Sequence, residues 1–390
     1  LFAIKIKEFM MAKIKQNIFI LIFLCSFGLN AQELILGANR IEQIISLTNE
    51  KSIAIVGNQT SMVNNTHLVD TLISLNQNIT TVFSPEHGFR GTGDAGAKIE
   101  NEVDIKTGIP IISLYGKNKK PKKQNLEDID VIVFDIQDVG ARFYTYISTL
   151  HYVLEACSEE NIKIIVLDRP NPNGHYIDGP ILEEKYKSFV GMHPIPIVHA
   201  MTIGEYAKMI IGEKWIEKKC DLTVIEMLNY NRNKIYELPI KPSPNLPNKK
   251  AVNLYPSLCL FEGTNVSIGR GTNQPFQHFG SPFLKFYSYS FQPKSGPGSK
   301  YPKHENKICY GKDITNTPIL NSINLEWLIE TYNQSQNKED FFISFFDKLA
   351  GTDKLRKQII SGKSIREIKK SWKTELNEFK NIRNKYLLYN

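Results

Sequence analysis

Apolar runs and helical repeats alternate along the first two thirds of the chain. Val131–Phe134 is an almost continuous apolar run, which is typical of a parallel strand buried on both faces. His67–Leu75 instead spaces its leucines at 68, 72 and 75 as one face of a helix. We predict strands at 52–56, 79–83, 109–114, 131–134, 162–167 and 222–226, and helices at 67–75, at 146–158 and from Thr202, where Glu205 completes a capping box. This alternation predicts an α/β fold with a doubly wound, mostly parallel sheet.

The pattern changes after a proline-rich stretch at 238–253, which we interpret as a linker or a long crossing segment. Beyond it the chain is rich in glycine and polar residues at 269–276 and in Pro, Gly and Ser at 290–302, a part that we expect to be exposed. Helical patterns follow at 325–333, 341–350 and 365–389. We therefore predict a main domain over 32–250 and a second, smaller α+β domain over 251–390.

The first residues have the features of an export signal. Met11 is a plausible start, Lys13 and Lys15 supply positive charge, and 18–29 is an apolar core that ends before Leu29-Asn30-Ala31. The core is short for a membrane span, although an uncleaved anchor is the alternative. We predict a signal peptide at 11–31, no stable membrane insertion, and a periplasmic or extracellular protein.

Charge and cysteine content narrow the functional classes. Without residues 1–31, which carry four lysines and one glutamate, the formal net charge falls from +8 to +5. This mild excess does not indicate nucleic acid as a partner. The densest basic run, Lys117–Lys123, is typical of a solvated loop, but in an exported protein it could also contact an anionic wall polymer. The spacing of Cys157, Cys220, Cys259 and Cys309 fits no metal motif and leaves their disulfide state open.

Polar clusters follow four of the predicted parallel strands, where ligands bind in open α/β sheets. Glu86 and His87 come directly after Pro85, which cannot continue a strand ladder. The clusters comprise Asn58; Glu86, His87 and Arg90; Asp135, Gln137, Asp138 and Arg142; and Asp168, Arg169 and Asn171, with Tyr115, Tyr144 and Tyr146 nearby. This mixture of carboxylates, amides, guanidinium groups and aromatic rings suits a polyhydroxylated ligand.

Several other kinds of site are disfavoured. The sequence lacks a Gly-x-Gly-x-x-Gly turn after the first strand, a Gly-Lys-Ser/Thr phosphate loop and a Gly-x-Ser-x-Gly elbow. We therefore predict no cofactor. Asp135, Asp138 and His87 could hold a metal ion, but such scattered groups more often form a hydrogen-bonded cluster. Asp168 and Arg169 could also be a structural ion pair.

Several segments resemble the NamZ family of exo-β-N-acetylmuramidases. The resemblance rests on residues 84–91 (SPEHGFRG), 135–146 (DIQDVGARFYTY), 168–172 (DRPNP), 262–265 (EGTN) and 269–272 (GRGT). It implies release of N-acetylmuramic acid from the non-reducing ends of peptidoglycan fragments. It also implies a Rossmann-like catalytic domain and a smaller C-terminal domain with a cleft between them.

Glycoside hydrolysis requires a proton donor and usually a second carboxylate. We assign Glu86 as general acid/base, His87 as a residue that tunes it, and Asp135 or Asp138 as the second group. Alternatively, the 2-acetamido group of the substrate attacks and an aspartate only orients it. The predicted substrate-binding residues are Asn58, Arg90, Gln137, Arg142, Tyr144, Asp168, Arg169, Asn171, Glu262, Arg270 and Thr272.

Arg142 and Arg270 are the candidates for binding the lactyl carboxylate of muramic acid, because a guanidinium group can bind a carboxylate through two hydrogen bonds. Two other functions stay open: a non-catalytic protein that binds peptidoglycan, and a metal-dependent amidase or deacetylase of the cell wall. The sequence leaves the oligomeric state open.

Overall fold

The computed structural model describes residues 2, 10–11, 13, 33–90, 102–234 and 236–390. The chain divides into two compact units, Leu1–Leu34 and Ile35–Asn390, and the account below concerns the second. The predicted signal peptide lies almost entirely outside the described residues. Among the residues that are described, no helix is long and apolar enough to cross a membrane.

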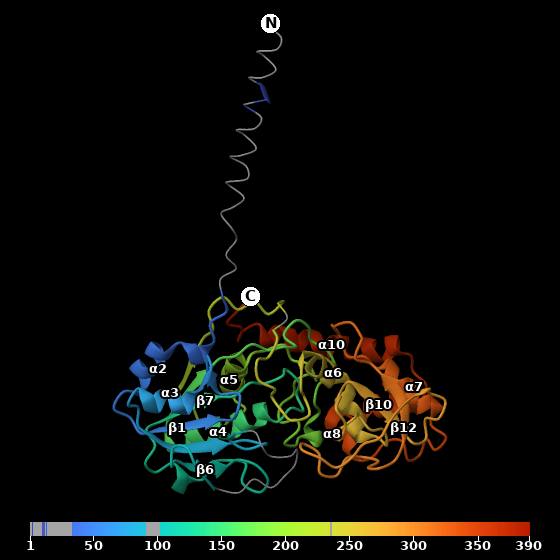
Figure 1. The fold of residues 1–390 in the computed structure, drawn as a ribbon, viewed down its shortest axis with the longest axis horizontal. Helices are drawn as coiled ribbons and strands as arrows, with labels where there is room; N and C mark the ends of the chain where they lie inside the picture. Colours follow the sequence, from blue (N-terminus) through green and yellow to red (C-terminus); the bar gives the residue numbers. More distant parts are fainter. Residues whose placement is uncertain (1, 3–9, 12, 14–32, 91–101, 235) are drawn as a thin grey trace. The chain divides into compact units, whose positions relative to one another are not determined.

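A seven-stranded sheet forms the core of the larger domain (Figure 1). Its order is β5-β6-β4-β1-β7-β8-β9, and all neighbours are parallel except β5 and β6. The strands are β1 (Ile53–Gly57), β4 (Ile79–Ser84), β5 (Glu102–Val103), β6 (Pro110–Ser113), β7 (Val131–Asp135), β8 (Lys163–Leu167) and β9 (Leu222–Ile225). The chain builds outward from β1 in one direction to β6 and then returns to β7 on the other side of β1. This order confirms the predicted doubly wound, mostly parallel sheet.

Alternation of side chains along the central strands builds two cores. Ile53 and Ile55 of β1 belong to a cluster with α2 (Ile41–Thr48) and α3 (Leu68–Ser74). Ala54 and Val56 belong to a second cluster with α4 (Tyr146–Glu160) and α5 (Ile203–Gly212). Successive residues of a strand point to opposite faces, so helices cover both faces of this sheet. That is why its central strands are mostly apolar on both faces.

Local capping interactions fix two helix starts next to the strand ends. Thr202 caps α5, its hydroxyl accepts a hydrogen bond from the Glu205 amide, and the Glu205 carboxylate accepts one from the Thr202 amide, as the sequence predicts. The His67 side chain accepts a hydrogen bond from the Val69 amide at the start of α3. A short hairpin, β2 (Met62–Val63) and β3 (Thr66–His67), leads into that helix.

The smaller domain surrounds a three-stranded antiparallel sheet of order β10-β12-β11. Its elements are α6 (Lys249–Leu258), β10 (His278–Ser281), β11 (Tyr289–Phe291), β12 (Cys309–Asp313), α7 (Glu326–Gln334), α8 (Phe345–Ala350), α9 (Lys354–Ile360) and α10 (Ile365–Arg383). Short 3-10 turns lie at Gly37–Asn39, Lys123–Asn125 and Glu184–Tyr186 in the larger domain and at Cys259–Gly263 in the smaller one. The cluster that contains α4 and α5 continues into this domain through residues such as Tyr255, Phe346 and Trp372.

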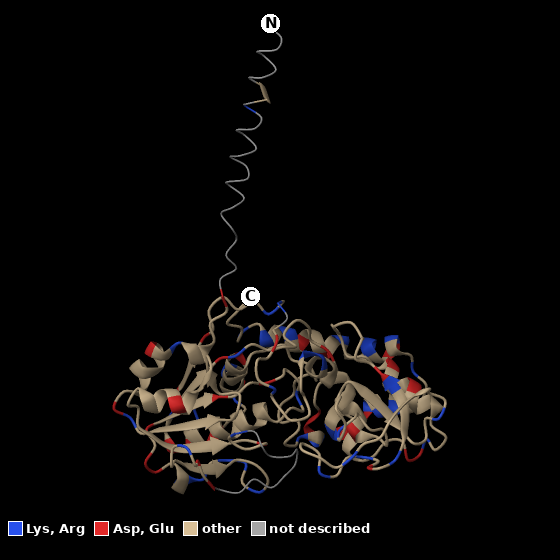
Figure 2. Ribbon diagram, viewed as in Figure 1, with Lys and Arg blue, Asp and Glu red and all other residues tan. Residues whose placement is uncertain are grey.

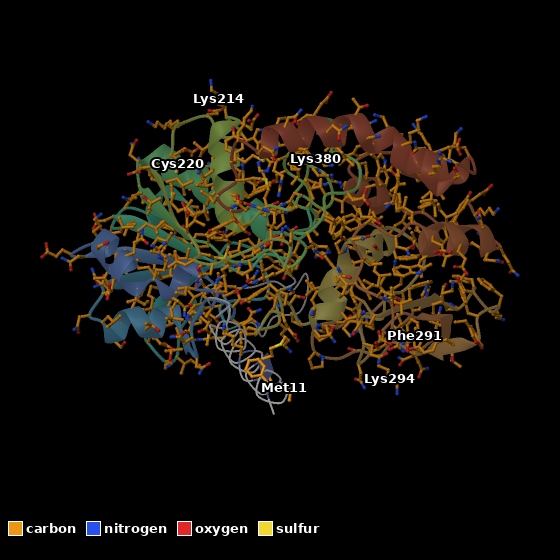
Figure 3. All side chains as sticks on the ribbon, turned by 90° about the horizontal axis from the view of Figure 1, so that it is seen from above. Met11, Lys214, Cys220, Phe291, Lys294 and Lys380 are labelled. Carbon is orange, nitrogen blue, oxygen red and sulfur yellow. The ribbon has the colours of Figure 1, made fainter. Side chains whose placement is uncertain are left out.

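The C-terminal helix α10 lies on the outside of the molecule. Trp372, Leu376 and Phe379 form its buried face, as the sequence predicts, while Lys380 is exposed on it (Figure 3). Both signs of charge alternate along its outer face (Figure 2). The helix is therefore amphipathic and packs against the core through one stripe.

Three features of the second domain differ from the sequence predictions. Helix α6 occupies part of the predicted linker and contains Pro256 near its end, which hides the helical pattern. The predicted helix at 341–350 begins only at Phe345, and the one at 365–389 ends at Arg383. β10, β11, β12 and α9 are absent from the prediction because each is short, at three to seven residues.

Candidate active site

The turn after β4 places Glu86 at the carboxyl end of the sheet. The strand ends at Ser84, Pro85 follows, and the Gly88 amide donates to the Pro85 carbonyl at 3.1 Å. His87 has φ +75° and Gly88 has φ +79°, so two successive residues are left-handed. For a residue with a Cβ atom this conformation costs about 1–3 kcal/mol. Such strain directly after a carboxylate is typical of a functional turn, and His87 is buried within it.

Two hydroxyl groups contact the Glu86 side chain. Thr145 Oγ1 donates to Glu86 Oε2 at 2.9 Å. Ser84 pairs with Ser113 in the register of β4 and β6, so Glu86 and Tyr115, each two residues further on, lie side by side. Tyr115 forms a side-chain hydrogen bond with Glu86, and burial followed by the Glu86 charge raises the pKa of Tyr115. Glu86 itself is only half-buried, so its carboxyl group combines fixed partners with access to solvent.

Tyrosine side chains continue from Glu86 towards the second domain. Tyr146 lies with its hydroxyl 3.5 Å from the Glu86 carbonyl oxygen, and Asn58 Nδ2 donates to that hydroxyl at 2.9 Å. The ring of Tyr146 contacts Tyr144 at 4.8 Å between centroids, and Tyr144 contacts Tyr255 at 5.7 Å. Asn58 is fully buried. Its side-chain amide, which the sequence assigns to substrate binding, bonds to Tyr146 in this structure.

The chain of rings ends at Arg270. Tyr255 lies 5.0 Å from Phe276, and the Arg270 guanidinium carbon lies 5.1 Å from the centre of the Phe276 ring. Arg270 Nε pairs with Glu262 Oε1 at 2.5 Å, and about a quarter of each side chain is exposed. No hydrogen bond to another described residue engages the two terminal nitrogens of Arg270. Arg270 thus keeps the geometry required of a carboxylate-binding residue.

Thr272 supports the loop that carries Arg270. Its hydroxyl donates to the Gly269 carbonyl at 2.7 Å and lies 3.0 Å from His278 Nε2. Gly269 and Gly271 have φ of +80° and +77°, which only glycine adopts without strain. The predicted binding residue Thr272 therefore shapes the loop in which Arg270 lies.

Asp135 and Arg169 form a buried ion pair. The Arg169 Nε and Nη2 atoms donate to the two carboxylate oxygens of Asp135 at 2.5 and 2.8 Å, and Nη2 also donates to the Met62 carbonyl. Both oxygens of Asp135 are thus occupied, and the residue is fully buried. The two side chains that the sequence assigns to catalysis and to substrate binding therefore bond to each other in this structure.

Asp168 does not pair with the Arg169 guanidinium group, so that alternative is wrong. Its carboxylate accepts hydrogen bonds from the hydroxyls of Thr202 and Tyr389 and from the Gly204 amide at 2.7–2.8 Å, and from the Arg169 amide at 3.0 Å. Burial raises the pKa of Asp168 to about 7. The carboxylate therefore anchors the start of α5 rather than a ligand.

Arg142, one of the predicted binding residues, is enclosed by protein groups. Its side chain is fully buried, and its terminal nitrogens donate to the carbonyls of Pro180, Ile195, Leu349 and Ala350 at 2.6–3.1 Å. Burial lowers the pKa of Arg142 to about 9. These contacts join the larger domain to α8 and occupy both terminal nitrogens of Arg142.

Three other predicted residues also bond to the protein itself. Arg90 holds Asp104 through two hydrogen bonds of 2.8 and 3.2 Å, on the side of α3. Gln137 Nε2 donates to two backbone carbonyls, and Asn171 Nδ2 donates to the Met201 carbonyl. The amide groups of Gln137 and Asn171 and the guanidinium group of Arg90 therefore have hydrogen-bond partners within the protein itself.

Asp138 differs from Asp135 because part of its carboxylate has no bonding partner. Asp138 Oδ2 accepts from the Gly140 amide at 2.6 Å, whereas Oδ1 is buried without a hydrogen bond in the described structure. Burial raises the pKa of Asp138 to about 7. His199 Nε2 lies 3.9 Å from Oδ2, and burial, ahead of the nearby arginines, lowers the pKa of His199 to about 3. Asp138 thus remains a candidate second group.

Sequence reasoning missed Thr145 and His199 and gave Tyr115 no defined role. Thr145 lies inside the 135–146 motif, so its position before a helix was a usable signal. His199 lies in an irregular segment, where no periodicity indicates its neighbours. The pairing of β4 with β6, which brings Tyr115 to Glu86, requires the sheet order.

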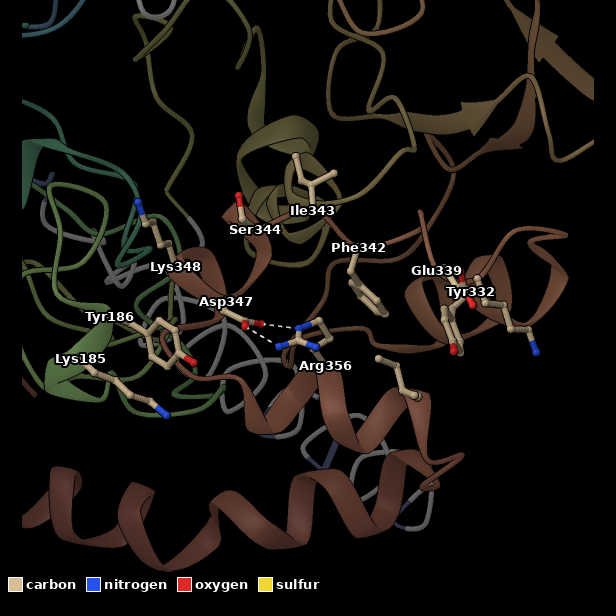
Figure 4. A pocket seen from close by; sticks show the side chains of 12 residues that line it. Lys185, Tyr186, Tyr332, Glu339, Phe342, Ile343, Ser344, Asp347, Lys348 and Arg356 are labelled. Carbon is tan, nitrogen blue, oxygen red and sulfur yellow. Dashed lines mark hydrogen bonds and ion pairs between the residues drawn. The ribbon is translucent and has the colours of Figure 1, made fainter.

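The described residues contain no group of three His, Cys, Asp or Glu side chains that could hold a metal ion. Cys157, Cys220, Cys259 and Cys309 are buried free thiols. A pocket of about 650 Å³ between the 184–186 turn and helices α7–α9 contains Tyr186, Phe342 and the Arg356–Asp347 ion pair (Figure 4). None of the predicted site residues lines it.

Comparisons with known proteins agree with this architecture. Residues 53–250 match the N-terminal domain of the exo-β-N-acetylmuramidase NamZ family, and residues 253–389 match its C-terminal domain. A relative from Bacillus subtilis, peptidoglycan β-N-acetylmuramidase NamZ, is 41% identical over 338 residues, covering 80% of each chain.

Two crystal structures of DUF1343 family proteins from Bacteroides fragilis share the fold. One is 48% identical with a TM-score of 0.86, and the other is 29% identical with a TM-score of 0.78. Each comparison covers 92% of this chain and 99% of the other. Because both family domains match in order and over most of its length, this chain belongs to the exo-β-N-acetylmuramidase NamZ family.

Proposed function

We propose that this protein is an exo-acting glycoside hydrolase that releases N-acetylmuramic acid from the non-reducing ends of peptidoglycan fragments. The observation that carries the proposal is the half-buried Glu86, held by Thr145 and Tyr115 at the carboxyl edge of the sheet in a chain of this family. The relative from Bacillus subtilis, which is named for this activity, supports the same reaction class.

Glu86 is the proton donor in this proposal. Its carboxylic acid protonates the glycosidic oxygen while the bond to the anomeric carbon breaks, and the resulting carboxylate later takes a proton from the attacking water. Asp138, with its unbonded Oδ1, is the better-placed candidate for the second role, since both oxygens of Asp135 bond to Arg169. Arg270 is the candidate for the lactyl carboxylate.

The first prediction concerns Glu86. Glu86→Gln keeps the side-chain shape and removes the transferable proton, so turnover of a chromogenic N-acetylmuramide should fall by about 10²–10⁴-fold. The measurement is the initial rate of chromophore release, with the melting temperature recorded for each variant. Glu127→Gln is the matched control, because Glu127 is exposed in the loop after the 3-10 turn at Lys123–Asn125. Retention of more than about half of the activity in Glu86→Gln would reject Glu86 as the acid.

The same assay separates the alternatives. A protein that only binds peptidoglycan would bind muramyl saccharides and release no sugar from them. A metal-dependent amidase or deacetylase would release peptide or acetate and lose activity with a chelator. Either result would contradict the glycosidase.

A further inference from the structure

A second group of aromatic rings, each half-buried, continues from Glu86 through Tyr115. Tyr115, which is hydrogen-bonded to Glu86, lies 6.2 Å from Phe189 between ring centroids. Phe189 stacks on Tyr152 at 6.3 Å with an interplanar angle of 23°. All three rings are partly exposed. Aromatic faces of this kind provide apolar surface for the C–H groups of a sugar ring.

A lysine completes the group. Lys119 Nζ lies 4.6 Å from the centre of the Phe189 ring. Its neighbour Lys120 pairs with Glu155 and Glu159 at 2.9 and 2.7 Å, which fastens the loop to α4. No carboxylate of a described residue pairs with Lys119, whose side chain is half-buried. The loop therefore presents one ammonium group over the Phe189 ring, where it is available to pair with an anion.

One face of α4 organises the whole arrangement. Thr145, Ser148, Tyr152, Glu155 and Glu159 are spaced by three and four residues and so lie on one side of the helix. Thr145 contacts the Glu86 carboxylate, Ser148 donates to the Phe189 carbonyl at 2.7 Å, and Tyr152 stacks on Phe189. Glu155 and Glu159 pair with Lys120. At 1.5 Å per residue, Tyr152 is about 10 Å along the axis from Thr145. The aromatic surface thus extends from Glu86, the proposed proton donor, over a length that can accommodate a sugar unit.

We propose that Tyr115, Phe189, Tyr152 and Lys119 form a saccharide subsite beside Glu86 that binds a sugar ring carrying a carboxylate. The rings contact the sugar and the ammonium group pairs with the carboxylate. This inference rests on the proposed function and adds the recognition of charge to it. The carboxylate belongs either to the lactyl group of the released sugar or to a muramic sugar in the fragment that remains, and the two sources share this chemistry.

The test compares Lys119→Met with Lys122→Met, which makes the same charge change at an exposed position of the same loop. The substrates are a chromogenic N-acetylmuramide, its lactate methyl ester, and a fragment with a second muramic sugar behind the scissile bond. Lys119→Met should lower kcat/KM about three- to tenfold on carboxylate-bearing substrates, mainly through KM, because a partly exposed ion pair is weak. Added salt should raise the KM of the wild type more than that of the variant.

The substrates identify the source of the carboxylate. A loss on the free muramide but not on its ester places the lactyl group of the released sugar at Lys119. A loss confined to the longer fragment places the carboxylate on the part that remains. Equal kinetics of Lys119→Met and Lys122→Met on every substrate overturn the subsite.

Binding separates this inference from the proposed catalysis. Calorimetric titration with the fragment that carries two muramic sugars should show a weaker affinity for Lys119→Met than for wild type, whether or not turnover occurs. Phe189→Ala should weaken the same affinity. Its melting temperature is the control that shows whether the variant is folded. Unchanged binding in both variants overturns the subsite even for an active enzyme, whereas wild type that binds without turnover contradicts only the glycosidase.

Discussion

Glu86 and Asp135 each follow a parallel strand, yet they meet different surroundings. Glu86 keeps access to solvent and is held by two hydroxyl groups. The Asp135 carboxylate is fully buried and paired with the Arg169 guanidinium group. A sequence shows both as acidic residues after an apolar run, and only burial separates them. At this scale, the sequence predicts which polar residues follow the strands, but it does not predict which partners from distant segments their side chains meet.

Asp138 provides a test of how burial changes a single carboxyl group. Its folded pKa of about 7 is above the unfolded value of about 4, so the folded state binds the proton more tightly. The stabilisation of the folded state by this tighter proton binding is fully present below about pH 4 and is lost as the pH rises through about 7. Asp138→Asn stays neutral and should therefore become more stable relative to wild type by about 1–3 kcal/mol between pH 5 and pH 8.

The measurement is chemical denaturation of both proteins across that pH range. Asp130→Asn is unsuitable as a control because the Asp130 carboxylate accepts from the Ser52 amide; Asp128→Asn, at an exposed position, is preferable. A difference in stability that does not change with pH would contradict the raised pKa. Turnover of the same variant then tests the second catalytic role of Asp138.

Elements with continuous apolar runs or a clear helical period are those that the sequence predicts well. β7, β8 and α4 fall within a few residues of their predicted bounds. The smaller domain is harder because β10, β11 and β12 are short, and their pairing depends on partners up to 35 positions away in the register from His278 to Asp313. Helix α6 is hidden by Pro256. Local pattern therefore predicts the parallel layer and misses the elements that tertiary contacts stabilise.

The start of α5 depends on a residue far along the chain. The Tyr389 hydroxyl donates to Asp168 Oδ2 at 2.7 Å and accepts from the Met227 amide at 2.9 Å. Tyr389→Phe removes both bonds and leaves buried polar groups unpaired, so we expect a loss of about 1–3 kcal/mol of unfolding free energy. Urea denaturation measures it, with Tyr301→Phe as the control because Tyr301 is largely exposed. Equal stability of the two variants would show that the bonds contribute nothing.

Across the whole molecule, one apolar core connects the sheet to the smaller domain. Arg142 reinforces that connection through its bonds to the carbonyls of Leu349 and Ala350. The aromatic chain from Tyr146 to Phe276 follows a parallel course. The two halves therefore have a common interior, and residues that join them lie close to the candidate site.

This organisation predicts the result of removing Arg142. Arg142→Met removes a hydrogen-bond donor from four buried carbonyls, of which, within the described structure, only that of Ile195 keeps another, the Leu182 amide, so the protein should lose about 2–4 kcal/mol of stability. Its folded fraction should discriminate free from esterified muramides as the wild type does. Denaturation and kcat/KM on both substrates measure the two effects, and Arg366→Met at an exposed position of α10 is the control. A selective loss on the free muramide without destabilisation would restore the binding role.

The left-handed backbone at His87 affects how this turn should be studied by mutagenesis. In a saturation library at this position, the stability of each variant will depend first on whether its residue tolerates a positive φ, and only then on the chemistry of its side chain. Glycine, and to a lesser degree asparagine, relieves the conformational penalty, whereas alanine retains it and removes the imidazole at the same time. Truncation to glycine is therefore the cleaner probe of the ring, and alanine scanning would mix two causes at the residue beside Glu86, the candidate proton donor.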